Sequence, residues 1–449
     1  MWGGDAPGSR RIDHCISDAA AEDPADGWTS LGRMPEIRPR EEQKAEGGWR
    51  SENGPMSTRS EAVLIDVVRT PVGRGKPGGI LSGVHPVDLA AGVLAAILDR
   101  SGLESAQIDD VLLGCVSQVG DQSSNIARQA VLAAGFDESV PAATIDRQCG
   151  SSQQAVHFAA QGIIAGAYDA VIVGGVESMS RVPLGSSAAG GSPMSPRLRE
   201  RYPDGLVNQG VSAELIAHRW GLDRDALDAY AAESHRRAAA AWDEGFFDRT
   251  AIGVAEAPDA VRDETVRDGT TASGLAGLQP AFRTDALAAR FPELDWRITP
   301  GNSSPLTDGA SAALLMSADR AEALGLTPRA RFHAFTVIGD DPLMMLTGPI
   351  PATRRILDRT GLSIDDLDAY EVNEAFASVP LAWAAEVGAD AERLNPRGGA
   401  IALGHALGSS GTRLLGTLVD QLDAVGGRYG LQTMCEGGGM ANATILERL

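Results

Sequence analysis

The chain has 449 residues, of which 43% are hydrophobic and 22% are charged, as in ordinary globular proteins. These proportions exclude wholesale disorder and collagen-like repeats, and no apolar run reaches the roughly 18 residues of a membrane-spanning helix. The formal net charge of −21 excludes nucleic acid and anionic membrane surfaces as natural partners.

Residues 1–56 differ from the rest of the chain. They are rich in Gly, Pro, Asp, Glu and Arg and show no apolar periodicity. We interpret them as a disordered or non-native N-terminal extension. Met56 lies just before the first strand-like run, so we expect the functional protein to start near this residue.

Beyond this segment, short apolar runs alternate with longer helix-like stretches. The pattern predicts buried strands at Val63–Val68, Val111–Leu113 and Ala170–Val173, and helices at Pro86–Arg100 and Gln153–Ala165. Such an alternation is typical of an α/β protein with helices layered on a sheet.

An internal repeat is visible within this pattern. Residues Ile97–Leu103 recur almost unchanged as Ile356–Leu362, and both copies end in Arg, a small polar residue and Gly, which is typical of a helix C-cap. Nearly the same register places Cys149–Ser152 opposite Leu407–Ser410. We therefore predict two copies of one α/β unit, at 57–178 (completed by 304–325) and 326–449.

The segment 179–303 separates the two copies. It is rich in Gly and Ser at 185–195, helix-like from Ser212 to Glu244, and then polar and acidic. We predict that it forms an inserted lobe or lid.

Cys149 is the first candidate for chemistry, because polar and glycine residues give way to a helical run at this point. A cysteine at a helix N-terminus gains from the dipole and from free N–H groups, which lower the pKa of the thiol. The sequence therefore predicts a reactive thiolate, and the alternative is a buried structural thiol. Cys115 is interpreted as a core residue and Cys15 as part of the extension.

His405 and Cys435 both lie in glycine-rich segments. Five glycines between Gly398 and Gly411 predict a tight turn around His405, which could deprotonate a thiol or merely complete the turn. Cys435 precedes three glycines, whose N–H groups could bind an anion while the thiol acts as acid or base. The alternative for Cys435 is a β-bulge beside a core thiol.

Asn373 lies where an apolar–polar alternation ends and a helical run begins. It is either a helix N-cap or an amide that holds a water for an oxyanion site. The cysteines have neither C-x-x-C nor zinc-finger spacing, so we expect no disulfide framework and no metal site. Scattered free thiols are typical of a reducing compartment, and we expect a cytoplasmic location.

In this order, the segments around Cys149, Asn373, His405 and Cys435 resemble the thiolase family (acetyl-CoA acetyltransferases and 3-ketoacyl-CoA thiolases) from about residue 60 to 449. The resemblance implies a five-layered α/β fold of two βαβαβαββ halves with an inserted loop domain. It implies ping-pong cleavage of a 3-ketoacyl-CoA by CoA, giving acetyl-CoA and a shortened acyl-CoA. No metal or redox cofactor is implied, since CoA is a substrate.

The resemblance also implies roles for individual residues. Cys149 is the acylated nucleophile, His405 activates it, and Cys435 moves the proton to or from the substrate α-carbon or the CoA thiol. Asn373 holds a water that forms one oxyanion hole with His405. The backbone N–H groups of Cys149 and Gly437 form the second hole.

Some positions depart from the family pattern. Ser304, in a segment that resembles the pantetheine-contacting loop, is followed by Pro305 where Gly is frequent. Ala406 stands where the family usually has Pro, which would leave the turn at His405 less rigid. The region around 185–191 differs from the cover loop of short-chain acetoacetyl-CoA thiolases, which favours another acyl group.

Within the family, the segments 146–154 and 427–439 look most like actinobacterial thiolases of steroid-ring breakdown, and fatty-acid catabolism is the related possibility. The competing activities are a biosynthetic acetoacetyl-CoA thiolase, a ketoacyl synthase on the same fold, and a non-catalytic protein that binds acyl-CoA. Ketoacyl synthases lack a late catalytic cysteine, so Cys435 argues against them. Family resemblance further implies a homodimer or homotetramer.

A chain that begins at Met56 tests the interpretation of the N-terminal segment. We predict that it remains soluble and keeps full thiolysis activity, because residues 1–56 contribute no apolar periodic face to a core. Activity and solubility are measured beside the full chain. A collapse of either would place the segment within the fold.

Overall fold

The computed structural model describes residues 61–449. The predicted extension at 1–56, with Cys15, lies outside the described residues. Within the described part, no helix has the length and apolar character needed to cross a membrane.

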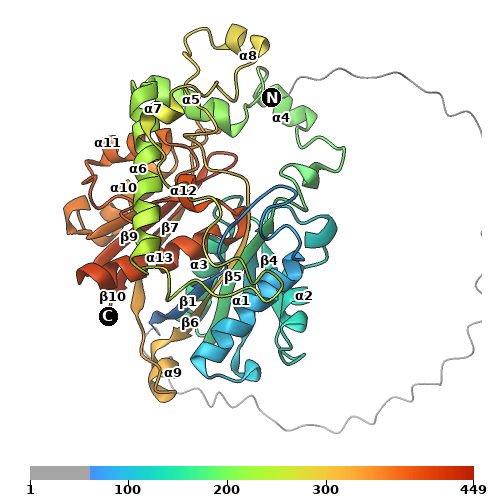
Figure 1. Cartoon of the computed structure of the whole chain (residues 1–449). Coiled ribbons are helices and arrows are strands. Elements are labelled where there is room, and N and C mark those ends of the chain that lie inside the picture. Colours follow the sequence, from blue (N-terminus) through green and yellow to red (C-terminus); the bar gives the residue numbers. More distant parts are fainter. Residues whose placement is uncertain (1–60) are drawn as a thin grey trace, which may run out of the picture. The chain divides into compact units, whose positions relative to one another are not determined.

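The N-terminal half alternates strands and helices along the chain (Figure 1). In the sheet its main strands follow the order β4-β3-β5-β6-β1, and the two-residue β2 pairs with β6. Strands predicted from apolar runs are confirmed in β1, β3 and β5. The elements of this half are β1 (Ala62–Arg69), β2 (Gly73–Arg74), α1 (Pro86–Ser101), β3 (Asp110–Gly114), α2 (Ile126–Ala133), β4 (Ala142–Ile145), α3 (Ser151–Ile164), β5 (Ala170–Ser178), β6 (Thr307–Ser317) and α9 (Ala318–Ala323).

The C-terminal half repeats this topology. Its strands follow the order β7-β10-β9-β8, and an isolated parallel bridge between Tyr370 and Leu394 adds the position beyond β8. Numbered by chain order within each half, both halves therefore read 3-2-4-5-1. The elements are β7 (Ala330–Gly339), α10 (Pro349–Thr360), β8 (Ala369–Val372), α11 (Ser378–Val387), α12 (Ala400–Leu403), α13 (Ser410–Val425), β9 (Tyr429–Glu436) and β10 (Met440–Arg448).

The repeated sequence occupies equivalent places in the two halves. α1 ends at Gly102 with φ 67°, and α10 ends at Gly361 with φ 72°. Both glycines adopt the left-handed conformation that closes a helix and that disfavours a residue with a Cβ. The two halves join where β1 pairs briefly with β7.

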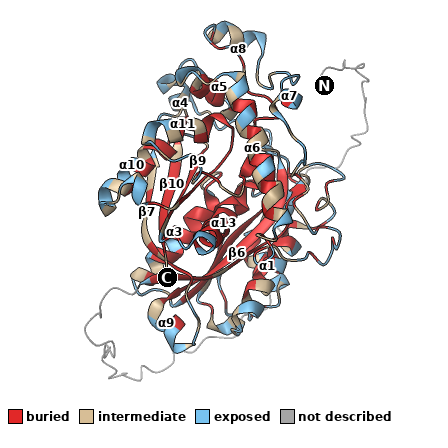
Figure 2. Cartoon of the chain, turned by 60° about the vertical axis from the view of Figure 1, so that its left-hand side comes forward, coloured by how far each residue is buried: buried red, intermediate tan, exposed pale blue. Residues whose placement is uncertain are grey.

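Three helix layers alternate with the strands. In β5, Ala170 and Ile172 face a core shared with α1 and α2, whereas Val171 and Val173 face a core shared with α3 and α13. A strand buried on both faces reads as one continuous apolar run, which explains the Ala170–Val173 sequence. A third core lies between the C-terminal strands and α10 and α11. The central helix α13 is almost wholly buried (Figure 2).

The described residues 179–306, between β5 and β6, contain helices and contribute no strand to the sheet. The helix-like stretch expected from Ser212 to Glu244 is confirmed and is divided between two helices. Gly221 adopts φ 62° and Asp223 caps a new helix through the N–H of Ala226, so α5 and α6 are separate. α6 packs against α12 of the C-terminal half (Figure 1). The helices are α4 (Pro196–Arg201), α5 (Gln209–Arg219), α6 (Arg224–Asp243), α7 (Ala272–Leu275) and α8 (Asp285–Arg290).

Candidate active site

The central helices and two strand ends bring the four predicted segments together. α3 begins at Ser151, just after Cys149, and α13 begins at Ser410, shortly after His405. β8 ends immediately before Asn373, and β9 ends one residue after Cys435. The fold therefore directs one polar or nucleophilic residue from each segment to the same region.

Cys149 lies in a sharp, tightly packed bend. Gln148 before it has φ 49°, a left-handed conformation that is uncommon for a residue with a side chain. A Cβ added to Gly150 after it would lie 1.9 Å from the Oε1 atom of Glu436, so only glycine fits there. The Cys149 side chain is buried in an apolar cluster with Met179, Leu407, Leu414 and Met434.

The expected low pKa of the Cys149 thiol is wrong. Burial, followed by the nearby carboxylate of Glu436, raises the pKa to about 12. The N–H groups of Cys149 and Gly437 and the side chain of Gln209 act in the opposite direction and lower this pKa. Desolvation outweighs these donors, so this thiol needs a base before it can act as a nucleophile.

His405 is the base that the sequence predicts, and its hydrogen bonds define its tautomer. Ser410 Oγ donates to the carbonyl oxygen of Ala406 at 2.8 Å and lies 2.7 Å from His405 Nδ1. Because that hydroxyl proton is already used, Nδ1 must carry the imidazole proton and donate it to Ser410. The lone pair is then on Nε2, which lies 3.4 Å from the amide nitrogen of Asn373.

Burial also sets the charge of His405. It lowers the pKa of the imidazole to about 3, and the positive charge of Arg413 acts in the same direction. The preceding Gly404 has φ 81°, and a Cβ there would lie 2.7 Å from side chains of Val72 and Thr307. The turn predicted from the glycines is therefore present, and it holds a neutral imidazole.

Asn373 is not a helix N-cap. The next helix, α11, begins at Ser378 with Ala377 as its N-cap, whereas the N–H of Asn373 continues the sheet by donating to Thr433 O at 3.1 Å. The side chain is buried, and its Oδ1 atom has no hydrogen-bond partner among the described residues. An unmatched buried acceptor of this kind leaves a place for one ordered water.

Cys435 lies on the strand β9 itself, and the turn follows as Gly437–Gly439. Its side chain is 1% exposed. Burial raises its pKa well above the ordinary value, and the neighbouring Cys149 and Glu436 charges add to the effect. Cys435 is therefore a proton-bearing thiol close to Cys149. Cys115 is buried in the N-terminal core, as predicted.

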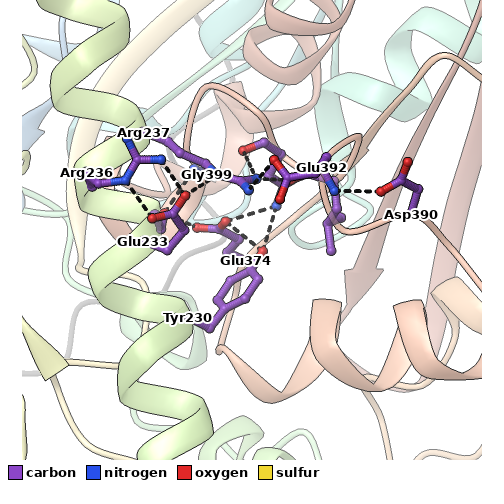
Figure 3. Close-up of polar contacts among 11 residues, drawn as sticks. Tyr230, Glu233, Arg236, Arg237, Glu374, Asp390, Glu392 and Gly399 are labelled. Carbon is purple, nitrogen blue, oxygen red and sulfur yellow. Dashed lines mark hydrogen bonds and ion pairs between the residues drawn. The ribbon is translucent and has the colours of Figure 1, made fainter.

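A buried carboxylate that the sequence did not reveal, Glu374, follows Asn373 in the chain (Figure 3). The carboxylate of Glu374 accepts hydrogen bonds from Tyr230 Oη at 2.9 Å, Ser234 Oγ at 2.6 Å, Asn395 Nδ2 at 3.0 Å and Ile401 N at 3.1 Å. It thereby ties α6 of the inserted segment to Asn395 and Ile401 of the C-terminal half. The only hint of Glu374 in the sequence is that it directly follows Asn373 in the segment Asn-Glu-Ala-Phe.

A cavity of about 400 Å³ adjoins the site. Arg74, Lys76 and Arg267 give it positive charge. His235 supports it by accepting a hydrogen bond from Arg267 N, and burial lowers the pKa of His235 to about 4. Leu275 lines the cavity and also packs in the apolar cluster that contains Cys435. The cavity and Cys435 thus share the apolar residues Leu275 and Ile401.

The predicted binding residue Ser304 lies beside this cavity. Gly301, Ser303 and Pro305 line it, whereas Ser304 Oγ donates to Ala375 O at 3.1 Å. Ser304 thus fastens the segment next to the Asn373 loop. Among the described residues, no group of three or more His, Cys, Asp or Glu side chains could hold a metal ion.

Family comparisons agree with this geometry. The description "Thiolase, N-terminal domain" matches residues 62–319, and "Thiolase, C-terminal domain" matches residues 326–448. Together they account for both halves of the sheet and the segment inserted between them. The fold and the paired-thiol site define an acyltransferase, and the chain belongs to the thiolase family.

Individual relatives are also similar. The steroid 3-ketoacyl-CoA thiolase FadA6 of Mycobacterium tuberculosis is 47% identical over 92% of this chain and its own full length. A 3-ketoacyl-CoA thiolase of Serratia proteamaculans is 42% identical over 86% of this chain and 99% of its own. The crystal structure of the Bacillus anthracis acetyl-CoA acetyltransferase is 36% identical, with a TM-score of 0.77, over 87% of this chain and 99% of its own.

The pKa of His405 predicts how stability depends on pH. In the unfolded chain a histidine binds a proton near pH 6.5, whereas the folded protein excludes this proton until about pH 3. Stability should therefore fall as pH falls through this window. His405→Gln removes this contribution, so its free energy of unfolding should fall less between pH 7 and pH 4 when measured by urea titration. His218→Gln, at an exposed position, controls for the lost histidine, and equal pH slopes for His405→Gln and wild type would contradict the assignment.

Proposed function

We propose that the protein is a 3-ketoacyl-CoA thiolase, which cleaves its substrate with CoA into acetyl-CoA and a shortened acyl-CoA. One observation carries the proposal: two buried thiols, Cys149 and Cys435, lie close enough for their charges to interact, and the N–H groups of Cys149 and Gly437 act to lower the pKa of the Cys149 thiol. One nucleophile and one separate proton carrier are what carbon–carbon cleavage followed by thioester exchange requires.

In the first half-reaction, Nε2 of His405 takes the proton of Cys149, and the thiolate attacks the C3 carbonyl. The N–H groups of Cys149 and Gly437 receive the developing alkoxide. The C2–C3 bond then breaks, and its electron pair forms the enolate of acetyl-CoA. A water held by Asn373 and the protonated His405 stabilise that enolate, while Cys435 donates its proton to C2.

In the second half-reaction, Cys435, now a thiolate, takes the proton of the incoming CoA thiol. The CoA sulfur attacks the acyl group on Cys149, and the same two N–H groups hold the tetrahedral oxyanion. When the carbon–sulfur bond to Cys149 breaks, the sulfur recovers its proton from His405. Both thiols and the imidazole return to their starting state, so no metal or redox cofactor takes part.

The cationic cavity supports CoA as the carrier of the acyl group. The chain has a net charge of −21, so its overall field repels the phosphates of CoA. Arg74, Lys76 and Arg267 line the cavity with one carboxylate, Glu264, which pairs with Arg74, so the lining keeps a net positive charge that suits phosphate. Leu275 and Ile401 offer apolar contacts that suit the pantetheine arm. We propose that Ser304 orders this segment, with direct contact coming from Gly301 and Ser303.

The substrate class that we propose is a bulky acyl group of the steroid type. The relative at 47% identity is named a steroid 3-ketoacyl-CoA thiolase, and the segment around 185–191 differs from the short-chain cover loop. We propose in addition a cytoplasmic location and a homodimer or homotetramer. The biosynthetic and non-catalytic alternatives are outcomes of the two tests below.

The acyl-enzyme test identifies the nucleophile. After incubation with acetyl-CoA, intact mass should show one acetyl group on wild type and none on Cys149→Ala, which lacks the attacking sulfur but keeps CoA binding. Cys115→Ala, at a buried core thiol, is the matched control and should acetylate normally. Absence of an acetyl-enzyme from wild type would favour the non-catalytic alternative.

A panel of 3-ketoacyl-CoA substrates tests the substrate class. We predict that kcat/KM for thiolysis rises with the bulk of the acyl group and is lowest for acetoacetyl-CoA. The physical reason is that the apolar cluster around Cys149 contributes binding energy only to an acyl group that reaches it. A sharp preference for acetoacetyl-CoA would contradict the steroid-type proposal and favour the biosynthetic alternative.

A further inference from the structure

Glu177 is a buried carboxylate outside the residues named so far. It lies on β5, and its residue is 0% exposed. Oε2 accepts hydrogen bonds from Val116 N at 2.9 Å and Gly408 N at 3.0 Å. Oε1 accepts them from Ser117 N at 3.1 Å and from Gln122 Nε2 at 2.8 Å. The two oxygens thus receive four donors from separate segments of the chain.

These donors belong to the two different halves of the fold. Val116 and Ser117 follow β3 of the N-terminal half, whereas Gly408 follows His405 in the C-terminal half. Gln122 is itself held, because its Oε1 accepts from Ser178 N at 2.6 Å and its Nε2 donates to Ser117 O at 2.9 Å. One carboxylate therefore joins the two halves beside the nucleophile.

Gly408 leads directly to the catalytic histidine. A Cβ on Gly408 would lie 2.3 Å from Val176 O, and a Cβ on Gly175 would lie 2.0 Å from Gly408 O, so this turn has no room to shift toward β5. The same turn carries Ser410, whose hydroxyl receives the Nδ1 proton of His405. A displacement of the turn would therefore rotate the imidazole.

The same carboxylate also shapes the surroundings of Cys149. Val116, which donates to Glu177, and Leu407, which precedes the donor Gly408, both pack in the apolar cluster around Cys149. We call Glu177 and its four hydrogen bonds the Glu177 clamp. Loss of this clamp would let Val116 and Leu407 move apart. The nucleophile and its base would then move relative to each other.

Ala406 makes this clamp important in this chain. A proline at this position would fix φ through its ring. Ala406 has φ −70° and ψ 105°, a conformation that proline adopts without strain, but alanine does not enforce it. The restraint on the turn must then come from contacts beyond residue 406.

We propose that Glu177 is a positioning residue that holds the His405 turn against the Cys149 segment, replacing the restraint that proline gives at position 406. The inference rests on the proposed function in one respect, the role of His405 as the base for Cys149. It adds a residue that touches neither substrate nor reacting atoms and acts through the Gly408 turn.

The main variant is Glu177→Gln, which keeps the shape of the side chain but places an NH₂ group against N–H donors. We predict that kcat for thiolysis falls about 10²-fold with little change in KM for CoA, as expected for a misplaced base. Alkylation of Cys149 by iodoacetamide, followed by peptide mass over pH 6–10, should slow by about tenfold. The alkylation measures the thiol and its base without turnover.

Glu214→Gln is the matched control. Glu214 is also buried and accepts two backbone N–H groups, from Arg297 and Ile298, both at 2.7 Å, in the inserted segment. It should lose stability but keep the wild-type alkylation profile of Cys149. Adding Ala406→Pro should restore about tenfold in kcat to Glu177→Gln, because proline fixes the turn independently, and should leave Glu214→Gln unchanged.

Wild-type alkylation and kcat in Glu177→Gln would overturn the proposal. The proposal would also be overturned if Glu177→Gln and Glu214→Gln lost kcat and alkylation rate equally and Ala406→Pro restored no kcat to Glu177→Gln. If Glu177→Gln lacks a native circular dichroism spectrum, Glu177→Asp is measured instead, with the same predictions. Failure of both to fold while Glu214→Gln folds would also overturn it, because Glu177 would then act on folding. A wild type that forms no acyl-enzyme contradicts the proposed function, whereas the alkylation comparison still tests the clamp.

Discussion

Desolvation of the site is the constraint on which the rest of this structure depends. Burial raises the pKa of both Cys149 and Cys435 and lowers that of His405, so the resting site contains two thiols and one neutral imidazole. None of these groups is reactive alone. Each step must pass a proton between neighbours, and the site works only if the neighbours are fixed within hydrogen-bonding reach.

The duplicated fold supplies that fixation. Each half has the same strand order, and each sends one helix, α3 or α13, into the shared central layer. The proposed nucleophile Cys149 and the proposed base His405 therefore lie just before these two buried helices, one in each half. Gly408 lets backbone segments approach closely, whereas a side chain at 150 or 404 would collide with those of Glu436 or of Val72 and Thr307. Buried carboxylates such as Glu374 then join the segments.

Patterns within a few consecutive residues were enough to predict some of the elements and to single out the candidate site residues. The apolar run at Ala170–Val173 and the glycines around His405 each indicated the correct structure. Asn373 was ambiguous, because only the hydrogen bond from its N–H to Thr433 O shows that the strand pattern continues there. The pKa of Cys149 could not be predicted from its helix, since its burial comes from residues as distant as Leu414 and Met434. Glu177 stayed hidden because its donors lie about 60 residues before it, at Val116, Ser117 and Gln122, and 231 residues after it, at Gly408.

The central claim is that two backbone N–H groups and two thiols form one acyl-transfer site. The most direct measurement is a crystal structure of the enzyme trapped with an acetyl group and CoA. We expect the acetyl group on Cys149, its carbonyl oxygen within hydrogen-bonding distance of the N–H groups of Cys149 and Gly437, and the Cys435 sulfur facing the CoA thiol. An acetyl group on another residue, or a carbonyl oxygen turned away from both N–H groups, would contradict the account.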